Sequence, residues 1–127
     1  MGEGLVALVG VRVEDALADA ENLARRIVHL RIFPDESQRM NRSLVDAGGT
    51  LAVVSQFTLY ADARKGRRPS YAKAAPAESA APLIDAVAAA VRRCGVTVVT
   101  GRFQAMMDVS LVNTGPVTIL LDTEGVF

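Results

Sequence analysis

The sequence is poor in the side chains that build metal and nucleophilic sites, and it has no excess of charge of either sign. Cys94 is the one cysteine, so neither an intrachain disulfide nor a cysteine-based metal cluster can form. No spacing of His, Cys, Asp and Glu indicates zinc or another metal, and we expect no cofactor. Fourteen Lys plus Arg balance fourteen Asp plus Glu. This balance argues against a generally basic nucleic-acid binder, so any contact with RNA must use a local patch.

Long apolar runs and a basic leader are also missing. No stretch is long and apolar enough to span a bilayer, and residues 1–4 lack the basic segment of a secretory signal. A cytoplasmic protein is the simplest interpretation. The 127 residues fit one domain, and half of them are hydrophobic, which is enough to build a core. We therefore expect a single domain over residues 1–127.

The apolar periodicity predicts an alternation of strands and helices. Strands are expected at residues 5–11, 51–60, 96–99, 107–112 and 117–121, the first of them buried on both faces, and helices at 14–30 and 76–94. The second helix should bury Ala80, Ile84, Val87, Ala88 and Val91 and end at Gly95. The order β-α-β-α-β-β-β predicts an α/β layered domain.

Two polar segments interrupt these apolar runs. They are Ser55-Gln56-Phe57-Thr58-Leu59-Tyr60 and Asn113-Thr114-Gly115-Pro116-Val117-Thr118. An unpaired buried polar group costs about 1–3 kcal/mol, so buried strands do not carry such residues without a reason. The two segments therefore suggest one site assembled from two strand ends.

Each chemically interesting residue also has a plain structural interpretation. Thr58 is an ordinary strand residue by propensity. His29, the one histidine, falls at a helix end, and Cys94 is expected to serve packing, so the sequence offers no catalytic triad. The basic segment 64–68 is either a phosphate contact or a solvated loop. From the sequence alone the bond between Gly115 and Pro116 is expected to be trans, because about 5–6% of X-Pro bonds are cis.

The two polar segments resemble the signature motifs of the D-aminoacyl-tRNA deacylases, also called D-tyrosyl-tRNA deacylases. Residues 30–33, 40–41, 61–70 and 100–103 are similar to that family too, in the same order along the chain. The resemblance implies a three-layer α/β/β fold in which two further strands, a β-hairpin, precede the pattern seen here. We interpret their absence as a wrongly assigned start. A truncated protein would leave a sheet edge unpaired, which would put its activity in doubt.

The resemblance implies hydrolysis of the ester that joins a D-amino acid to the 3′-terminal ribose of a tRNA, a proofreading step in translation. Backbone N–H groups of Phe57 and Thr58 would stabilise the oxyanion, while the 2′-hydroxyl of the terminal adenosine helps to activate water. The Thr58 hydroxyl would hydrogen-bond the substrate or, as a second option, attack it. The expected substrate-binding residues are Ser55, Gln56, Gly115, Pro116, Val117 and Thr118.

Chirality is read in this family by a Gly-cisPro pair inserted into the site of the neighbouring subunit. The resemblance thus implies a homodimer in which Gly115 and Pro116 point main-chain carbonyls at the substrate's α-amino group. An L-side chain would collide with the loop, whereas glycine would not, so removal of glycine mischarged on tRNA-Ala is an implied second activity. The expected tRNA-binding residues are Arg64, Lys65, Arg67, Arg68 and Met106, with Met106 more exposed than Met107.

Two other functions stay open. One is a related aminoacyl-tRNA editing domain with different selectivity, for example for L-alanine on the wrong tRNA. The other is a binding module that holds tRNA ends or small D-amino acids without turnover.

Overall fold

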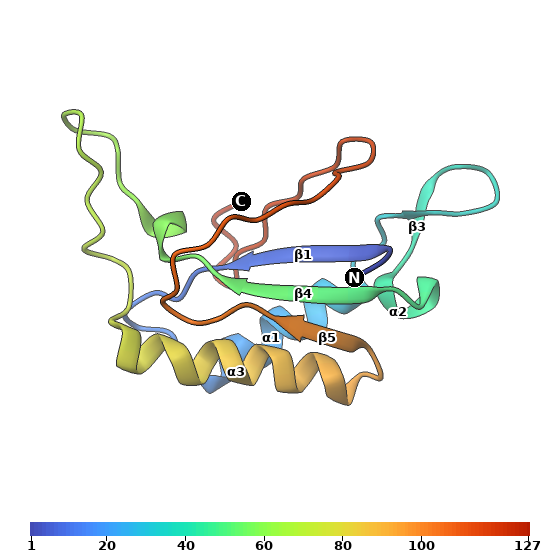
Figure 1. The fold of residues 1–127 in the computed structure, drawn as a ribbon, viewed down its shortest axis with the longest axis horizontal. Coiled ribbons are helices and arrows are strands. Elements are labelled where there is room, and N and C mark those ends of the chain that lie inside the picture. Colours follow the sequence, from blue (N-terminus) through green and yellow to red (C-terminus); the bar gives the residue numbers. More distant parts are fainter.

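Two helices cover one face of a parallel sheet in the computed structural model, which describes residues 1–127 (Figure 1). The sheet has the order β1-β4-β5, and both pairs of neighbouring strands are parallel. Its elements are β1 (Gly4–Val9), α1 (Leu17–His29), β4 (Thr50–Ser55), α3 (Ala77–Arg93) and β5 (Thr97–Thr100). A helix lies in each connection between parallel strands, so the carboxyl ends of all three strands lie at one edge of the sheet.

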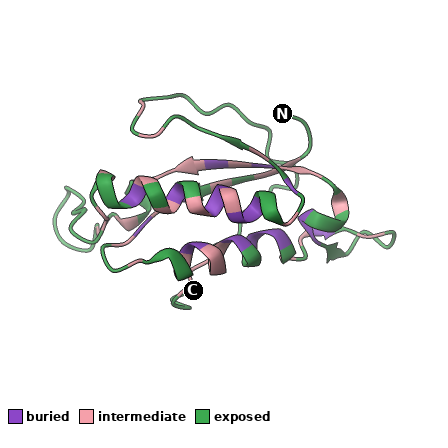
Figure 2. Cartoon of the chain, turned by 90° about the horizontal axis from the view of Figure 1, so that it is seen from below, coloured by how far each residue is buried: buried purple, intermediate pink, exposed green.

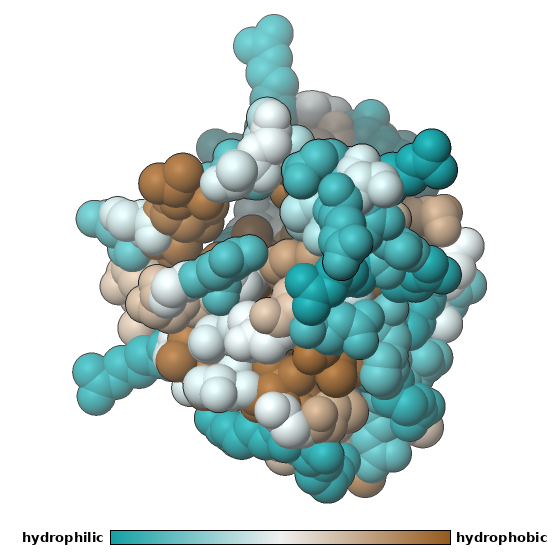
Figure 3. Space-filling view, turned by 90° about the vertical axis from the view of Figure 1, so that its right-hand side faces the viewer, coloured by the Kyte–Doolittle hydropathy of each residue, from teal (hydrophilic) through white to brown (hydrophobic).

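Shorter elements fill the connection between α1 and β4. The strands β2 (Phe33–Pro34) and β3 (Met40–Arg42) pair antiparallel, and the single turn α2 (Leu44–Ala47) follows them. Ser43 caps α2, because its hydroxyl accepts a hydrogen bond from the Asp46 N–H and the Asp46 carboxylate accepts one from the Ser43 N–H, both at 3.1 Å. The surface at this end of the molecule is mostly hydrophilic, with separate apolar patches (Figure 3).

The two long helices form where the apolar periodicity predicts them. α3 follows Pro76, whose φ of −64° suits a helix start, and the chain leaves it through Gly95 with a φ of +83°. The Asp19 carboxylate supports the start of α1 by accepting a hydrogen bond from the Ala16 N–H at 2.8 Å. Figure 2 shows α1 and α3 side by side beneath the sheet, each with a stripe of buried residues. The predicted stripe of α3 is confirmed at every position, namely Ala80, Ile84, Val87, Ala88 and Val91. Neither helix is long and apolar enough to cross a membrane.

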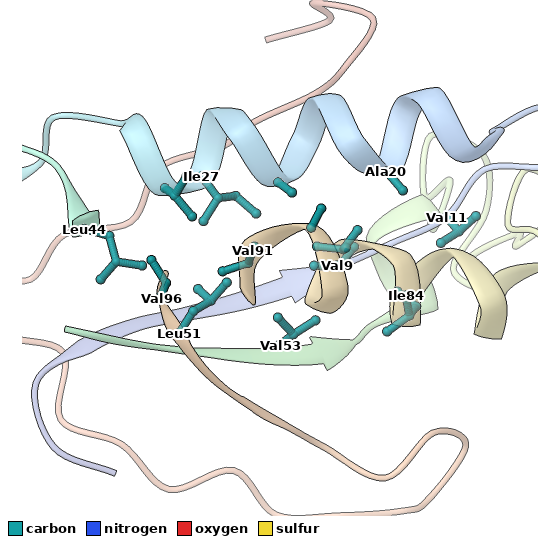
Figure 4. Packing of buried hydrophobic residues seen from close by; sticks show 14 of the residues in the cluster. Val9, Val11, Ala20, Ile27, Leu44, Leu51, Val53, Ile84, Val91 and Val96 are labelled. Atoms are coloured by element: carbon teal, nitrogen blue, oxygen red, sulfur yellow. The ribbon is translucent and has the colours of Figure 1, made fainter. Parts of the chain in front are cut away.

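The core lies between the helices and the sheet (Figure 4). Its largest fully buried side chains are Leu44, Leu51, Val28, Val53 and Val91. Leu51 and Val53 alternate along β4, so both point at the helices. Full burial of a valine or leucine side chain stabilises the fold by about 1.5–3 kcal/mol. This packing fixes β4 in place, and with it the residues that follow its carboxyl end.

The first strand is not buried on both faces as predicted. Val6 and Leu8 of β1 are 39% and 48% exposed, whereas Val9 on the helix side is buried. The register places Val6 opposite Ala52 and Leu8 opposite Val54, so these side chains share the face of the sheet that the helices do not cover. The continuous apolar run therefore did not indicate burial on both faces, because the helices bury only one side of the strand.

The expectation of a second β layer and of three C-terminal strands is also corrected. β5 forms close to the predicted residues, but residues 107–112 and 117–121 are in no strand. Residues 101–118 run along the side of the sheet opposite the helices (Figure 1). The chain then returns to the edge beside α1, where the Asp122 carbonyl accepts a hydrogen bond from Arg26 at 2.7 Å, and Phe103 and Leu121 pack against the core. Apolar alternation alone does not make a strand, because a strand needs a partner with which to exchange backbone hydrogen bonds. The predicted α/β fold class is nevertheless confirmed, since the observed fold is a mixed α/β domain with one parallel sheet.

Candidate active site

The segment 55–60 is a turn at the carboxyl end of β4 and not part of the strand, which corrects the predicted strand 51–60. β4 ends at Ser55, and a 3₁₀ turn, η1 (Phe57–Tyr60), follows. The Gln56 N–H donates to the Val9 carbonyl at 2.8 Å, which holds the start of the turn against the end of β1. The Leu59 N–H then donates to the Gln56 carbonyl at 3.2 Å and closes the turn. Ligands of open α/β sheets bind at this edge, beyond the carboxyl ends of the strands.

Thr58 lies exposed in η1, so its interpretation as an ordinary strand threonine is wrong. The side-chain amide of Gln56 donates a hydrogen bond to its hydroxyl oxygen. The N–H groups of Phe57 and Thr58 take part in no turn, loop or cap hydrogen bond, and the first N–H groups of a helical turn have no acceptor within it. The turn therefore presents two backbone donors and one hydroxyl on an exposed surface.

Neither His29 nor Cys94 lies in this turn. His29 is the exposed last residue of α1, close enough to α2 that, after Ser43 and Arg42, it helps to lower the pKa of Asp46. Its position as a helix-end histidine is confirmed. Cys94 follows the last residue of α3 and is half-buried against the core.

The peptide bond between Gly115 and Pro116 in the loop 113–118 is cis. The resemblance implied a cis bond, whereas the low frequency of cis X-Pro bonds had favoured trans. Asn113 braces this loop from inside. Its side-chain oxygen accepts a hydrogen bond from the Val117 N–H at 3.0 Å, and its side-chain nitrogen donates to the Thr118 hydroxyl at 3.3 Å. Gly115 has a φ of +125°, a conformation that residues with a side chain rarely adopt.

The structure does not bring the two polar segments together within one chain. In Figure 1 the C-terminal segment makes a hairpin-like excursion whose tip points away from the sheet, toward the end of the molecule opposite η1. All residues of this loop except Val117 are exposed. The expected single site built from two strand ends therefore does not form inside one chain.

The basic segment 64–68 lies in a loop closed at its base by Asp62 and Ser70. Their backbones exchange two hydrogen bonds, at 2.7 and 2.8 Å. Arg64 is paired with Asp62, since its Nε and Nη2 atoms donate to the two carboxylate oxygens at 2.9 and 2.7 Å. These bonds lower the pKa of the Asp62 carboxyl and raise the pKa of Arg64. The loop's other cations, Lys65, Arg67 and Arg68, are exposed and form no salt bridge.

A small cavity of about 60 Å³ lies between η1 and the C-terminal segment, and its lining includes Gly10, Asp15, Tyr60 and Asp122. Burial, with the carboxylates of Asp15 and Asp122 nearby, raises the pKa of Tyr60. An ion pair between Arg12 and Glu124 anchors the same segment. The C-terminal segment is thus held beside the turn, although the loop 113–118 reaches away from it.

Met106 is fully exposed and Met107 is 43% exposed, so the predicted difference between the two is confirmed. A Cβ on Gly101 would lie 3.6 Å from Met107 and 3.7 Å from the Val54 side chain. Met107 therefore lies over the sheet face opposite the helices, while Met106 points into solvent.

Three residues with a part in this geometry were absent from the predicted set. Asn113 braces the Gly-Pro loop, Asp62 neutralises Arg64, and Tyr71 packs edge to face against Phe57 with ring centroids 5.1 Å apart. Asn113 was within the quoted motif, and Asp62 stands two residues before Arg64, so both had a signal in the sequence. The contact between Phe57 and Tyr71 depends on the path of the intervening loop and had none.

Comparison with known proteins agrees with the motifs. A family model described as D-Tyr-tRNA(Tyr) deacylase matches residues 1–122. The chain is 61% identical over 123 residues to the D-aminoacyl-tRNA deacylase of Roseiflexus sp. (strain RS-1), covering 97% of this chain and 79% of the relative. It is 60% identical over 123 residues to the protein of the same name from Thermomicrobium roseum, covering 97% of this chain and 80% of the relative.

A solved structure titled "c-Myc DNA Unwinding Element Binding Protein" has the same fold. It aligns with a TM-score of 0.87 and 35% identity, covering 95% of this chain and 83% of that chain. The match extends over nearly all of the chain, so it supports the arrangement of helices and sheet described above.

Proposed function

The chain belongs to the D-Tyr-tRNA(Tyr) deacylase family and is a D-aminoacyl-tRNA deacylase, an ester hydrolase, and from this premise we propose which of its residues bind the ester and which select the chirality of the amino acid. The turn η1 holds the ester, and the loop 113–118 of a partner subunit reads its chirality. The observation that carries this proposal is the separation of the two motifs within one chain (Figure 1). A loop that points away from its own turn can complete the turn of a second copy.

The chemistry at η1 requires no side-chain base. Water attacks the ester carbonyl, and the N–H groups of Phe57 and Thr58 donate to the oxyanion that forms; each such donor supplies about 3–4 kcal/mol in other enzymes. The oxyanion then collapses and the bond to the ribose 3′-oxygen breaks, so that this oxygen takes up the proton lost by the water and leaves as the 3′-hydroxyl. The Thr58 oxygen already accepts a hydrogen bond from Gln56, so its own proton is free to be donated to the substrate. No histidine, lysine or carboxylate is hydrogen-bonded to the Thr58 hydroxyl, so we assign it as a donor and not as the nucleophile. Activation of the water by the substrate's 2′-hydroxyl fits this lack of a base.

Selectivity comes from the backbone at Gly115 and Pro116. A backbone selector suits an enzyme that must accept many D-side chains, because a pocket shaped for one side chain would exclude the others. Two hydrogen bonds within the loop hold it in shape, because the Asn113 side chain accepts one from the Val117 N–H and donates one to the Thr118 hydroxyl. Glycine has no side chain to collide with this loop, so we expect glycine on tRNA-Ala to be a second substrate.

The rest of the tRNA meets the exposed cations of the basic loop, and Met106 adds an exposed apolar contact. Lys65, Arg67 and Arg68 have no carboxylate partner, so they are free to contact phosphates. Because the substrate is charged tRNA, we place the activity in the cytoplasm.

Hydrolysis of labelled D-aminoacyl-tRNA, with the L-isomer and glycyl-tRNA-Ala measured in parallel, tests the substrate assignment. We expect fast release of the D-amino acid and of glycine and little release of the L-amino acid. Fast release of the L-isomer would favour an editing domain of different selectivity. Binding without turnover would favour a module that only holds tRNA ends.

Mixing two damaged variants tests the cross-subunit arrangement. Thr58→Ala damages the turn and Gly115→Ala damages the loop, so each homodimer has two incomplete sites. Random mixing makes half of the dimers mixed, and each of these has one intact turn facing one intact loop, so about a quarter of the wild-type rate should return. No recovery, with native mass spectrometry showing that mixed dimers form, would contradict the arrangement.

A further inference from the structure

Two exposed aromatic side chains form a pair, one in the turn η1 and one just after the basic loop. Phe57 is 56% exposed and Tyr71 is 40% exposed, and their rings meet at 66° with centroids 5.1 Å apart. In an edge-to-face pair the edge of one ring packs against the face of the other, so the remaining apolar surface of both rings faces solvent. Phe57 and Tyr71 lie 14 positions apart in the sequence, so this exposed surface is built by the fold.

The pair connects the ester-binding turn to the base of the loop that carries the unpaired cations. Phe57 directly precedes Thr58, and Tyr71 directly follows Ser70, whose backbone closes the basic loop against Asp62. In Figure 1 this loop leaves η1, projects from the body of the molecule, and returns toward α3. A chain of nucleotides running from Thr58 to the basic loop must therefore pass over the aromatic pair.

The unpaired 3′ end of a tRNA has the chemistry that fits this path. Its terminal ribose carries the ester, its upstream phosphates are attracted to Lys65, Arg67 and Arg68, and its unpaired bases have open faces that stack on aromatic rings. Stacking tolerates any base and suits an enzyme that accepts many tRNAs. Resting on the proposed function, we propose that Tyr71, supported by Phe57, stacks a base upstream of the terminal adenosine and so positions the 3′ end.

Steady-state kinetics on two substrates test this assignment. One substrate is D-aminoacyl-tRNA, and the other is 3′-O-D-aminoacyl-adenosine, which lacks every upstream nucleotide. Tyr71→Ala should raise KM for the tRNA about tenfold, a loss of about 1.4 kcal/mol, with kcat unchanged and with the adenosine ester hydrolysed as in the wild type. Tyr71→Phe keeps the ring and should restore the wild-type KM. Phe127→Ala, which removes an exposed aromatic side chain at the C-terminus, is the matched control and should change neither value.

An equal loss on both substrates, or no loss on the tRNA, would overturn the role of Tyr71. Turnover of the adenosine ester by the wild type reports on the proposed function separately, because that reaction needs no upstream base.

A fluorescence experiment observes the stacking directly. The chain has two tyrosines and no tryptophan, so in Tyr60→Phe the remaining emission at tyrosine wavelengths comes from Tyr71. A CCA trinucleotide should quench this emission, whereas the same trinucleotide with abasic sites in place of both cytosines should not. Equal quenching by both oligonucleotides would show that no upstream base stacks on Tyr71.

Discussion

The pairing of Arg64 with Asp62 makes a quantitative prediction about tRNA binding. A protein that neutralises phosphates releases counterions, so the logarithm of its affinity falls with the logarithm of salt concentration by about 0.7–0.9 for each contact. Lys65, Arg67 and Arg68 form no salt bridge, so replacing all three by alanine should reduce the slope by about 2–2.7. Arg64 already donates to both carboxylate oxygens of Asp62. Arg64→Ala should therefore reduce the slope by well under half of the value of about 0.7–0.9 that one phosphate contact contributes.

Asp62→Asn provides the sharper test. Asparagine keeps the Oδ1 atom that accepts the Arg64 N–H at 3.1 Å, but it removes the negative charge. Arg64 then becomes a free cation, and the salt dependence should steepen by up to one contact, about 0.7–0.9. Asp62→Asn should therefore lower the Kd for tRNA at low salt.

The assay is fluorescence anisotropy of labelled tRNA titrated with protein between about 50 and 200 mM salt, the range over which such slopes are well defined. Arg93→Ala is the matched control, because Arg93 is an exposed, unpaired arginine at the end of α3. If Arg64→Ala lowers the slope as much as Lys65→Ala does, the ion pair does not shield Arg64. If the triple variant keeps the wild-type slope, the loop contacts no phosphate.

Three further predictions concern the fold and the site. Leu51→Ala should lower the free energy of unfolding by about 2–5 kcal/mol in urea denaturation, because Leu51 is fully buried beneath the helices; a loss below about 1 kcal/mol would contradict that packing. Asn113→Ala removes the acceptor of the Val117 N–H and should lower kcat for D-aminoacyl-tRNA with little change in Tm, since the loop is exposed; a matching fall in Tm would instead indicate a role in folding. His29→Ala and Cys94→Ala should each keep most of the deacylation rate, and a thousandfold loss in either, about 4 kcal/mol of barrier, would identify a catalyst that the present mechanism omits.

The parts of the fold that local patterns determine were predictable. A helix with one buried face repeats apolar residues every three to four positions, and this repeat located α1 and α3 and every predicted buried residue of α3. Gly95 ended α3 as expected because a left-handed residue closes a helix at low cost when it is glycine. The two polar motifs were also visible, and with them the family.

What depends on neighbours distant in sequence was decided by the tertiary structure. The same apolar alternation gives a strand at β5 and none at 107–112, because a strand exists only where another strand accepts its hydrogen bonds. Gln56 bonds to the end of β1, so the predicted strand turns into η1 and Thr58 becomes an exposed donor. Whether a basic residue is free, as Lys65 is, or neutralised, as Arg64 is, depends on side-chain geometry that composition does not contain. The sequence alone placed the two motifs to which we assign the chemistry, and the packing of distant segments determined which of their residues are exposed.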